Sequence, residues 1–537
     1  MSASRQTLLA AAAFTVSVLY LTLFFQLGST AFMGADEPRY ARIAQEMEES
    51  GDWITPRLED HPWLEKPPFL YWTAAASYSL LGVSETAARL PNALLGALAA
   101  LALLLMGSFV AGPRAGLFSL LILATSPLFV GLSRSASMDA PLTAAFTWAC
   151  VLGFLAGEDG LSPRLRLLCS ALSGLSLGAA VLAKGPVALV LFGAVFGFYF
   201  LWLQRLSWSL LQAALAAAVF LLSALPWYLW VWQANGYDFL ITFWINHHLA
   251  RFISDIHHHS EPFWYYLVVL LFGFFPWFFY LGPALAGLWK RRKELRGRGG
   301  RAEVFLWIWA LLPFLFFSAS ASKLGGYILP IFPALSLLVG LLWDRHADLE
   351  VSLYRGLKRS TRMLSIFVLI LIGALPIAAS VFYHSALLGL WLALPLAAGM
   401  AVLWLRTGHA RPGPAFITLT AMMTLFVALA YAKAGPVVQD FHSTRGIVRW
   451  AEPELTPQRP LVFYRFFHHS ARYYAGYQAR GQAIHRYDEL LEFFKETSWD
   501  RYLILTKEEG WQDLDAYFHS RLLSRQGEFY LVEVRPA

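Results

Sequence analysis

Residues 363–383 read MLSIFVLILIGALPIAASVFY, a run of 21 residues without a charged side chain. A helix needs about 20 predominantly apolar residues to cross the hydrocarbon core of a bilayer. This stretch is therefore long and apolar enough to span a membrane. Comparable runs recur along most of the chain, so the stretch indicates the architecture of the whole protein.

The overall composition agrees with a membrane protein. The 537 residues are 57% hydrophobic and 14% charged, and the mean hydropathy is +0.51. Soluble domains are about 45–50% apolar and about 25% charged. These values exclude a cytosolic enzyme, a disordered chain and a fibrous protein, and they make the lipid bilayer the expected partner rather than nucleic acid. Cys150 and Cys169 both lie in apolar stretches, so no disulfide framework or paired-cysteine metal motif is expected.

Thirteen segments are candidates for spanning helices. The first has a long apolar run and no clear small-x-small cleavage site, so we interpret it as an anchor rather than a signal peptide. The expected spans are 7–27, 86–110, 114–132, 140–157, 166–183, 185–204, 207–232, 264–288, 302–319, 325–343, 363–383, 385–406 and 414–432.

The basic residues predict an orientation, because Lys and Arg collect in cytoplasmic loops. With the N-terminus inside, one set of connections carries most of them. This set comprises Arg5, Arg114, Arg164, Arg166, Arg205, the cluster from Lys290 to Arg301, the group from Arg345 to Arg362, and Arg406 with Arg411. The long connections at about 28–85 and 233–263 then lie outside, together with the tail. The pattern predicts an odd number of spans, with the N-terminus cytoplasmic and the C-terminus outside.

The tail from Lys433 onward differs in kind from the rest of the chain. Charge density rises, and strand-like runs at Leu461–Tyr464, Tyr502–Thr506 and Phe529–Val534 alternate with helix-like stretches such as Tyr487–Thr497. We therefore expect a polytopic α-helical membrane domain over residues 1–432 and a small soluble α/β domain over residues 433–537.

The first outer connection holds the most informative polar residues. Asp36 and Glu37 directly follow the first span, and residues 37–49 predict a short amphipathic helix that lies in the membrane interface. Its apolar face carries Tyr40, Ile43, Ala44 and Met47, and its polar face carries Arg39, Arg42, Glu46 and Glu49. The alternative is that the two acidic residues are simply solvated.

Four further polar clusters fall on the outer side. Asp139 opens a predicted span, where a helix N-cap is the plainer interpretation. Lys184 separates two apolar runs and either faces a cavity or sits in a turn. Five histidines within residues 247–259 suggest a metal site or a solvated loop. Lys323 and Tyr327 precede another span and are expected to face outward.

All of these clusters lie on one side of the membrane, which favours an enzyme whose site opens at the outer leaflet. A transporter would place ionisable groups along the interior of its spans. The chain has no Gly-rich loop ending in GKS or GKT. Because nucleotide sugars are not expected outside the cell, a substrate carried by a lipid fits better.

The order of these motifs resembles a known family. It comprises Asp36-Glu37-x-Arg39-Tyr40-Ala41, Ser50-Gly-Asp-Trp53, Glu65-Lys66-Pro67 with Tyr71-Trp72, Asp139-x-Pro141, Lys184-Gly185, His248-x-x-Arg251-Phe252, Pro262-Phe-Trp-Tyr-Tyr266 and Lys323-Leu-x-x-Tyr327. This succession, from about residue 30 to residue 335, resembles the aminoarabinose transferases of lipid A (the ArnT family). They are polyprenol-phosphate-dependent glycosyltransferases of the GT-C type, related to the protein O-mannosyltransferases.

The resemblance implies an activity. The family transfers 4-amino-4-deoxy-L-arabinose from undecaprenyl phosphate to a phosphate of lipid A at the periplasmic face of the bacterial inner membrane, a modification associated with polymyxin resistance. The expected partners are accordingly an undecaprenyl-phosphate-linked sugar donor and lipid A or another membrane acceptor.

The resemblance also assigns roles to residues. The implied catalytic residues are Asp36, Glu37 and Asp139. The donor phosphate would be bound by Lys66, Arg39, Arg251 and Tyr327, with Tyr40, Lys184 and Lys323 in support. Glu65 and His248 match positions that can hold a zinc-like divalent ion, and no cofactor is expected to be required for turnover.

The chain departs from the family pattern in three places. The usual Lys-Leu-Pro-x-Tyr is Lys323-Leu-Gly-Gly-Tyr327, larger residues begin at Pro68, and His247 stands where a Glu is common. These departures bear on the identity of the sugar and of the acceptor more than on the class of the donor. Two alternatives therefore stay open: another GT-C transferase that moves a hexose such as mannose to protein, glycan or lipid, and a lipid or solute transporter.

Overall fold

The computed structural model of the chain describes residues 2–250, 261–290, 295, 298–347, 354–406, 412–456, 459–497 and 499–535. Within this part of the chain, ten helices are long and apolar enough to cross a membrane, or up to twelve if each of two bent helix pairs is one span. The pairs bend by 69° after Ala124 and by 106° after Gly273. One shorter apolar helix, Val187–Leu203, has 17 residues. Each of the thirteen expected segments falls on one of these features, which confirms the helical membrane fold.

The helices of the bundle follow one another along the chain, with a long first connection at residues 25–84. They are α1 (Ser2–Leu19) with η1 (Tyr20–Phe24), α4 (Glu85–Ala111), α5 (Pro113–Ala124), α6 (Pro127–Ser133), α7 (Asp139–Ala156), α8 (Pro163–Lys184), α9 (Val187–Leu203), α10 (Leu210–Phe239) with η2 (Leu240–Ala250), α12 (Tyr265–Gly273), η3 (Trp277–Tyr280), α13 (Leu281–Lys290), α14 (Arg298–Ala319), η4 (Gly325–Ile331), α15 (Phe332–Ala347), α16 (Tyr354–Tyr383), α17 (Ala386–Arg406), and α18 (Pro412–Leu429) with η6 (Ala430–Ala434) and α19 (Gly435–His442).

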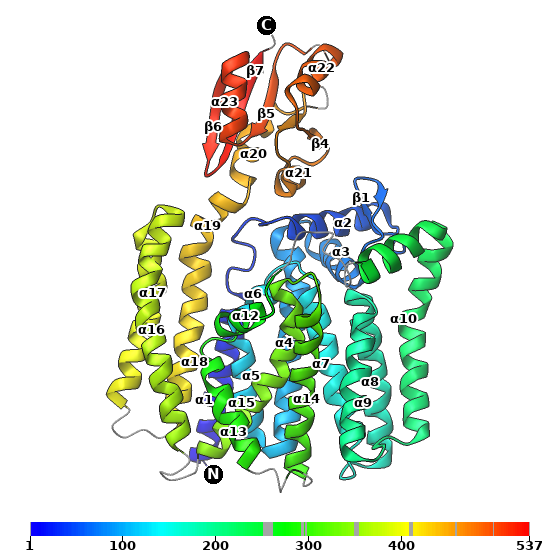
Figure 1. The fold of residues 1–537 in the computed structure, drawn as a ribbon, viewed down its shortest axis with the longest axis vertical. Helices are drawn as coiled ribbons and strands as arrows, with labels where there is room; N and C mark the ends of the chain where they lie inside the picture. Colours follow the sequence, from blue (N-terminus) through cyan, green and yellow to red (C-terminus); the bar gives the residue numbers. More distant parts are fainter. Residues whose placement is uncertain are drawn as a thin grey trace.

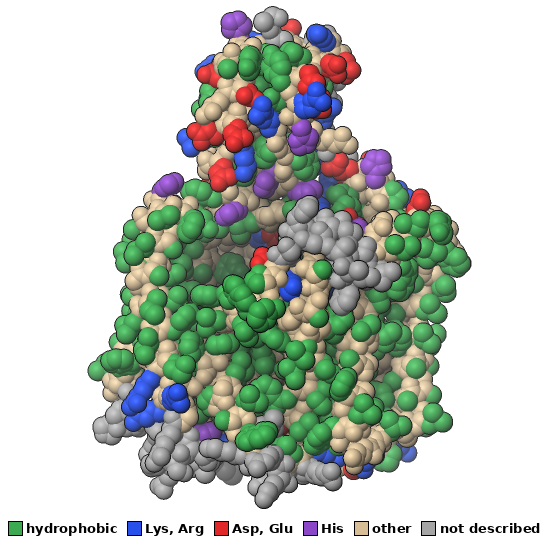
Figure 2. Space-filling view, viewed as in Figure 1, with side chains coloured by type: hydrophobic (Ala, Val, Ile, Leu, Met, Phe, Trp, Pro, Cys, Tyr) green, Lys and Arg blue, Asp and Glu red, His purple; other side chains and the backbone are tan. Residues whose placement is uncertain are grey.

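The position of each helix follows from its side chains. α7 is apolar all round and is buried along nearly its whole length, as expected of a helix at the centre of a bundle. α16 lies at the periphery and exposes Ile366, Leu369, Ile370 and Ile377. On a long apolar helix, such a row of exposed aliphatic side chains is suited to contact with lipid. The N-terminus and the C-terminal domain lie at opposite ends of the bundle, and Lys and Arg side chains are visible at the end that carries the N-terminus (Figures 1 and 2).

The expected interfacial helix exists as α2 (Asp36–Ser50), but it does not lie exposed on the membrane surface. It is followed by a small hairpin of β1 (Arg57–Leu58) and β2 (His61–Pro62) and by α3 (Phe69–Leu81). Arg42 and Glu46, expected on a polar outer face, are buried. The reason is that α2 packs against α3 and the hairpin on one side and against a helix of the C-terminal domain on the other.

The C-terminal domain is a five-stranded sheet with helices on both faces, which confirms the expected small α/β unit. Its strands are β3 (Leu461–Tyr464), β4 (Ala479–Ile484), β5 (Tyr502–Thr506), β6 (His519–Gln526) and β7 (Phe529–Arg535), in the order β4-β3-β5-β7-β6. β3 is parallel to β4 and β5, whereas β7 is antiparallel to β5 and β6. The sequence did not reveal β4 and β6.

Side chains alternate between the two faces of this sheet. Leu461 and Phe463 pack on one face with α20 (Arg445–Ala451) and α21 (His469–Ala475). Val462 and Tyr464 pack on the other with α22 (Tyr487–Thr497) and α23 (Glu508–Tyr517). The domain boundary at 432/433 stays a prediction, and the helical run that contains the last span continues to His442.

Candidate functional site

The candidate site lies at the end of the bundle that carries the C-terminal domain. Asp139 is the first residue of α7 and Lys184 is the last residue of α8, and the Lys184 ammonium contacts the Asp139 carboxylate. The same ammonium lies 4.5 Å from the ring centre of Tyr327 in η4. The position before the helix is occupied by Met138, so Asp139 is not the N-cap. Three predicted residues from three separate elements therefore form one charged cluster.

The backbone of η4 approaches this cluster closely. A Cβ atom on Gly326 would lie 2.5 Å from Oδ2 of Asp139, so only glycine allows this approach. At Gly325, where the family has proline, an added Cβ would meet Tyr265 at 3.6 Å, an ordinary contact. The departure from the family motif at Gly325 therefore lies against Tyr265 and leaves the Asp139 contact unchanged.

A second part of the site is built by the first turn of α2. Arg39 contacts the Asp36 carboxylate, and its guanidinium lies 6.0 Å from the Tyr40 ring and 5.3 Å from the Trp63 ring. Such aromatic faces stabilise a cation. Asp36 is exposed, with 60% of its side chain accessible. A charged pair that is open to solvent on one side and held by rings on the other is suited to bind a polar ligand.

Tyr40 connects the two parts electrostatically. It is buried and contacts the ring of Tyr71 at 6.0 Å between ring centres. Burial raises the pKa of the Tyr40 phenol, and the negative charge of Asp36 raises it further. Asp139 and Glu65 also raise the pKa of this phenol, so both carboxylates lie within electrostatic range of it. Tyr40 is therefore a protonated hydrogen-bond donor among carboxylates.

Glu65 and Lys66 lie directly before α3. Oε1 of Glu65 is 3.6 Å from Nε2 of His247, and Lys66 is half-buried. The histidine beside Glu65 is thus His247. The side chain of the expected ligand His248 lies outside the described part of the structure, and so does all of Arg251. Zinc takes three or four protein ligands. Within the described part of the chain no group of three potential metal ligands occurs, so these residues alone do not complete a zinc site.

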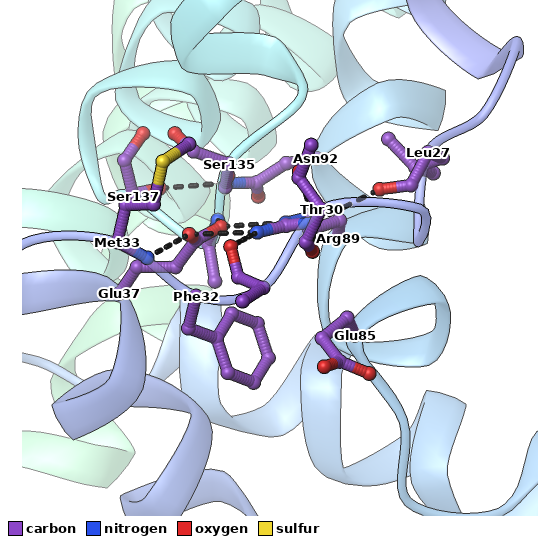
Figure 3. A network of polar contacts seen from close by, with 12 residues as sticks. Leu27, Thr30, Phe32, Met33, Glu37, Glu85, Arg89, Asn92, Ser135 and Ser137 are labelled. Carbon is purple, nitrogen blue, oxygen red and sulfur yellow. Dashed lines mark hydrogen bonds and ion pairs between the residues drawn. The ribbon is translucent and has the colours of Figure 1, made fainter. Parts of the chain in front are cut away.

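Glu37 is buried and fully engaged in a network that positions the site (Figure 3). Its two carboxylate oxygens accept from Nε and Nη2 of Arg89 at 2.7 and 2.8 Å. They also accept from the backbone nitrogens of Met33 and Ala136 at 3.3 and 3.1 Å. This carboxylate therefore ties the first loop and α2 to α4 and to the segment before Asp139. The catalytic assignment of Glu37 stays a prediction, and the geometry favours a positioning role.

Asn92, one turn after Arg89 on α4, extends the same network. Its amide donates to the carbonyl oxygens of Ser135 and Ser137 at 2.7 and 2.8 Å. These contacts fix the turn that leads into Asp139. Sequence analysis overlooked both α4 residues because they lie within an apolar span, although a charge in such a span is itself a signal of function or of buried pairing.

Lys323 does not face outward as expected. Its side chain is buried and Nζ donates to the carbonyl oxygen of Ser320 at 2.8 Å. The loop before η4 folds over the ammonium, so a local carbonyl satisfies it. Its supporting role stays a prediction.

The C-terminal domain closes over this region. Arg472 of α21 pairs with Glu59 of the first loop at 2.8 Å, and Arg445 and Tyr474 both donate to Glu85 at 2.9 Å. His469 lies within electrostatic range of the site. Burial lowers the pKa of its imidazole, the charge of Arg39 lowers this pKa further, and the charge of Asp36 raises it. Sequence analysis assigned no site to this domain. Beneath it, Figure 2 shows a hollow with acidic and basic side chains between apolar walls.

Comparisons with known proteins agree with this geometry. Residues 65–232 match the family model described as dolichyl-phosphate-mannose-protein mannosyltransferase. The chain is 36% identical over 306 residues to an undecaprenyl phosphate-alpha-4-amino-4-deoxy-L-arabinose arabinosyl transferase of Pseudomonas aeruginosa, which covers 57% of this chain and 54% of that protein. A transferase of the same description from Proteus mirabilis is 32% identical over 320 residues, covering 59% and 57%. The matched segment thus spans little more than half of these relatives.

The structural comparison extends over the rest of the chain. The crystal structure of ArnT from Cupriavidus metallidurans bound to undecaprenyl phosphate covers 98% of both chains, with a TM-score of 0.82 and 25% identity. The resemblance to the ArnT family is confirmed. Both the helical bundle and the C-terminal domain share the fold of this ArnT structure.

Proposed function

We propose that this chain is an integral membrane glycosyltransferase that moves 4-amino-4-deoxy-L-arabinose from undecaprenyl phosphate to a phosphate of lipid A. The observation that carries the proposal is the likeness, over 98% of the chain, to an ArnT structure bound to undecaprenyl phosphate. The polar cluster at one end of an otherwise apolar bundle supports it, because a lipid-linked donor enters from the membrane. The enzyme would lie in the bacterial inner membrane, with its N-terminus cytoplasmic and its C-terminal domain periplasmic.

The reaction breaks the bond between the sugar's anomeric carbon and the carrier phosphate. The leaving undecaprenyl phosphate keeps the bonding electrons, so negative charge grows on its oxygens. Cations stabilise that charge in the transition state. Lys66, Arg39, Arg251 and Tyr327 are the proposed phosphate ligands, and of these Arg251 lies outside the described residues. Arginine suits two-pronged phosphate binding and lysine acts as a point charge.

The chemical nature of the acceptor determines the roles of Asp36 and Asp139. A lipid A phosphate is already anionic and attacks without a general base, so Asp36 would orient the acceptor or bind the ammonium of the aminosugar. Asp139 is paired with the Lys184 ammonium. In this proposal the Asp139–Lys184 pair holds its two opposite charges in a fixed position in the site. The neutral phenol of Tyr40 donates a hydrogen bond to a ligand in the same site.

A divalent ion between Glu65 and a histidine is a separate proposal. The carboxylate and the imidazole are suitable zinc ligands. We expect turnover without it, and no step of the reaction above passes through a metal.

A second transferase activity has one specific observation in its favour. The matching family model is that of a mannosyltransferase acting on protein. Mass spectrometry of lipid A from cells with and without the gene separates the two. Loss of the aminopentose adduct on deletion supports the proposal. An unchanged lipid A together with a lost hexose on protein or glycan supports the alternative.

A further inference from the structure

A cavity of about 640 Å³ lies between the C-terminal domain and the membrane bundle, away from the candidate site. Its volume is in the range of ligand pockets, about 300–1,000 Å³. The domain contributes the residues that follow β3 and β5 and the turn between β6 and β7. The bundle contributes Phe382 and His384 from the end of α16 and Phe441 from α19. The cavity is thus assembled from two parts of the fold that meet at the membrane surface (Figure 1).

The topology of the sheet places this cavity at a favoured binding position. From β3 the chain moves outward to β4, whereas from β5 it moves to the opposite side, toward β7 and β6. Ligands of open α/β sheets bind at the carboxyl ends of the strands where the order reverses in this way. Arg465 directly follows β3 and Lys507 directly follows β5, and both line the cavity.

Close packing of α23 shapes the floor of the cavity. A Cβ atom on Gly510 would lie 2.0 Å from Oγ1 of Thr506, so glycine is needed for the first turn of α23 to approach the end of β5. Oγ1 of Thr506 in turn donates to the carbonyl oxygen of Tyr464 at 2.9 Å. The ends of the two strands and the start of the helix are therefore locked together.

The lining carries both signs of charge. Nζ of Lys507 is 2.8 Å from Oε2 of Glu528, and the guanidinium of Arg525 lies 4.8 Å from the ring centre of Tyr530. Glu508 and Glu509 also line the cavity, on the first turn of α23. A simple anion would bind beside these carboxylates at a cost. A ligand with a phosphate and an ammonium would match the cations and the carboxylates together.

The membrane side of the cavity is hydrophobic. Phe382 is 69% exposed and Val381 is 65% exposed at the end of α16. This helix also exposes Ile377 one turn earlier, on a surface suited to hydrocarbon chains. The cavity therefore opens at the depth where the headgroups of lipids lie.

We propose that this cavity binds the headgroup of a zwitterionic phospholipid of the outer leaflet. The phosphate lies against Arg525 and Lys507, the ammonium lies against Glu508 and Glu509, and the acyl chains run along the end of α16. The bound lipid bridges the C-terminal domain and the bundle. This inference does not depend on the sugar or the acceptor of the proposed reaction.

Native mass spectrometry of the purified full-length protein tests the proposal. The protein is exchanged into micelles that contain phosphatidylethanolamine, phosphatidylglycerol or phosphatidylcholine, and retained lipid is counted. We expect one phosphatidylethanolamine to be retained in preference to the other two, because only its primary ammonium donates hydrogen bonds to carboxylates. Equal retention of all three lipids, or displacement of the lipid by inorganic phosphate alone, would overturn the proposal.

Matched variants locate the bound lipid. Arg525→Gln and Lys507→Gln should each lower retention about tenfold, the usual effect of losing one charge-assisted hydrogen bond. Glu508→Gln combined with Glu509→Gln should remove the preference for phosphatidylethanolamine over phosphatidylglycerol. Arg521→Gln on β6, which is exposed and outside the cavity, is the control. A loss in the control as large as that in Arg525→Gln would contradict the assignment. All five positions are exposed, so folding is retained, and a circular dichroism spectrum verifies it.

Discussion

Glu37 of α2 and Arg89 of α4 form a buried two-pronged ion pair, with N–O distances of 2.7 and 2.8 Å. The guanidinium also donates to the carbonyl oxygens of Leu27, Thr30 and Ala31. A single pair therefore holds the loop that leads from the first span into the candidate site.

Removing one partner of this pair should unfold the outer end of the bundle. Arg89→Ala leaves the Glu37 carboxylate buried without its counter-charge, at a cost of about 3–5 kcal/mol. Tryptophan fluorescence during thermal unfolding of the solubilised protein measures the effect. Arg486→Gln removes an exposed, solvent-screened pair with Asp488 and should leave the melting temperature close to that of the wild type. Equal melting temperatures for the two variants would show that the buried pair is unimportant.

The Asp139–Lys184 pair should matter for transfer rather than for folding. Asp139→Asn and Lys184→Gln are each expected to reduce the transfer rate about 100-fold, since each removes a preorganised charge from the site. The double variant should lose little more than either single one, because the two residues act as a unit. Initial rates with the lipid-linked donor provide the measurement. Asp159→Asn, at an exposed pair with Arg205, is the control. Additive losses would mean that the two residues act separately.

Lys66 should carry much of the stabilisation of the leaving phosphate. Lys66→Ala is expected to lower transfer by roughly 100-fold, and Lys66→Arg should recover part of the rate. Arg57→Gln in the same loop removes a comparable cation that is paired with Asp52 and should leave the rate unchanged. A folded Lys66→Ala protein with the wild-type rate would exclude this role.

The role of Asp36 is read from the pH dependence of the rate. With a phosphate acceptor, Asp36→Asn should lower the rate at all pH values without changing the shape of the profile. If the nucleophile were instead a hydroxyl, the acidic limb of the profile would report deprotonation of Asp36 and would disappear in the variant. Loss of that limb would therefore contradict a phosphate acceptor.

Acidification should loosen the C-terminal domain. Burial and the charge of Arg39 lower the pKa of His469 to about 4, and burial and Lys507 lower that of His468 to about 4. In the unfolded chain both imidazoles have a pKa of about 6.5. The folded state binds fewer protons, so this stabilisation is complete above about pH 6.5 and is lost as the pH falls toward 4. Melting temperatures across this range should fall less in a His468→Asn, His469→Gln variant than in the wild type. His519→Gln, an exposed change on β6, should retain the wild-type slope.

The sequence predicted the parts of the fold that depend on local composition. Apolar runs marked every membrane helix, and β3 and α22 begin and end at the expected residues. The burial of Arg42 and Glu46 could not be predicted from the α2 sequence, because the C-terminal domain that covers them is more than 400 residues away in the chain. For the same reason Glu37 appeared as a free acid, although its partner Arg89 lies 52 residues later.

The site was predictable only as a set of motifs. Asp139, Lys184 and Tyr327 do form one cluster, but their contacts depend on how three helices end at the same level. Lys323 was expected to face outward, and a carbonyl of its own loop binds it instead. Hydrophobic patterning carries no information about such short-range polar partners. His469 was not considered because nothing in its local sequence shows that α21 docks on α2.

The most direct test of the central claim uses purified protein, undecaprenyl phosphate carrying 4-amino-4-deoxy-L-arabinose, and lipid A in defined micelles. We expect the donor to be consumed, undecaprenyl phosphate to be released, and one aminopentose to appear on a phosphate of lipid A by mass spectrometry. Lys66→Ala should abolish most of this signal. A donor that remains intact in the presence of the folded wild-type protein and lipid A would contradict the proposed activity.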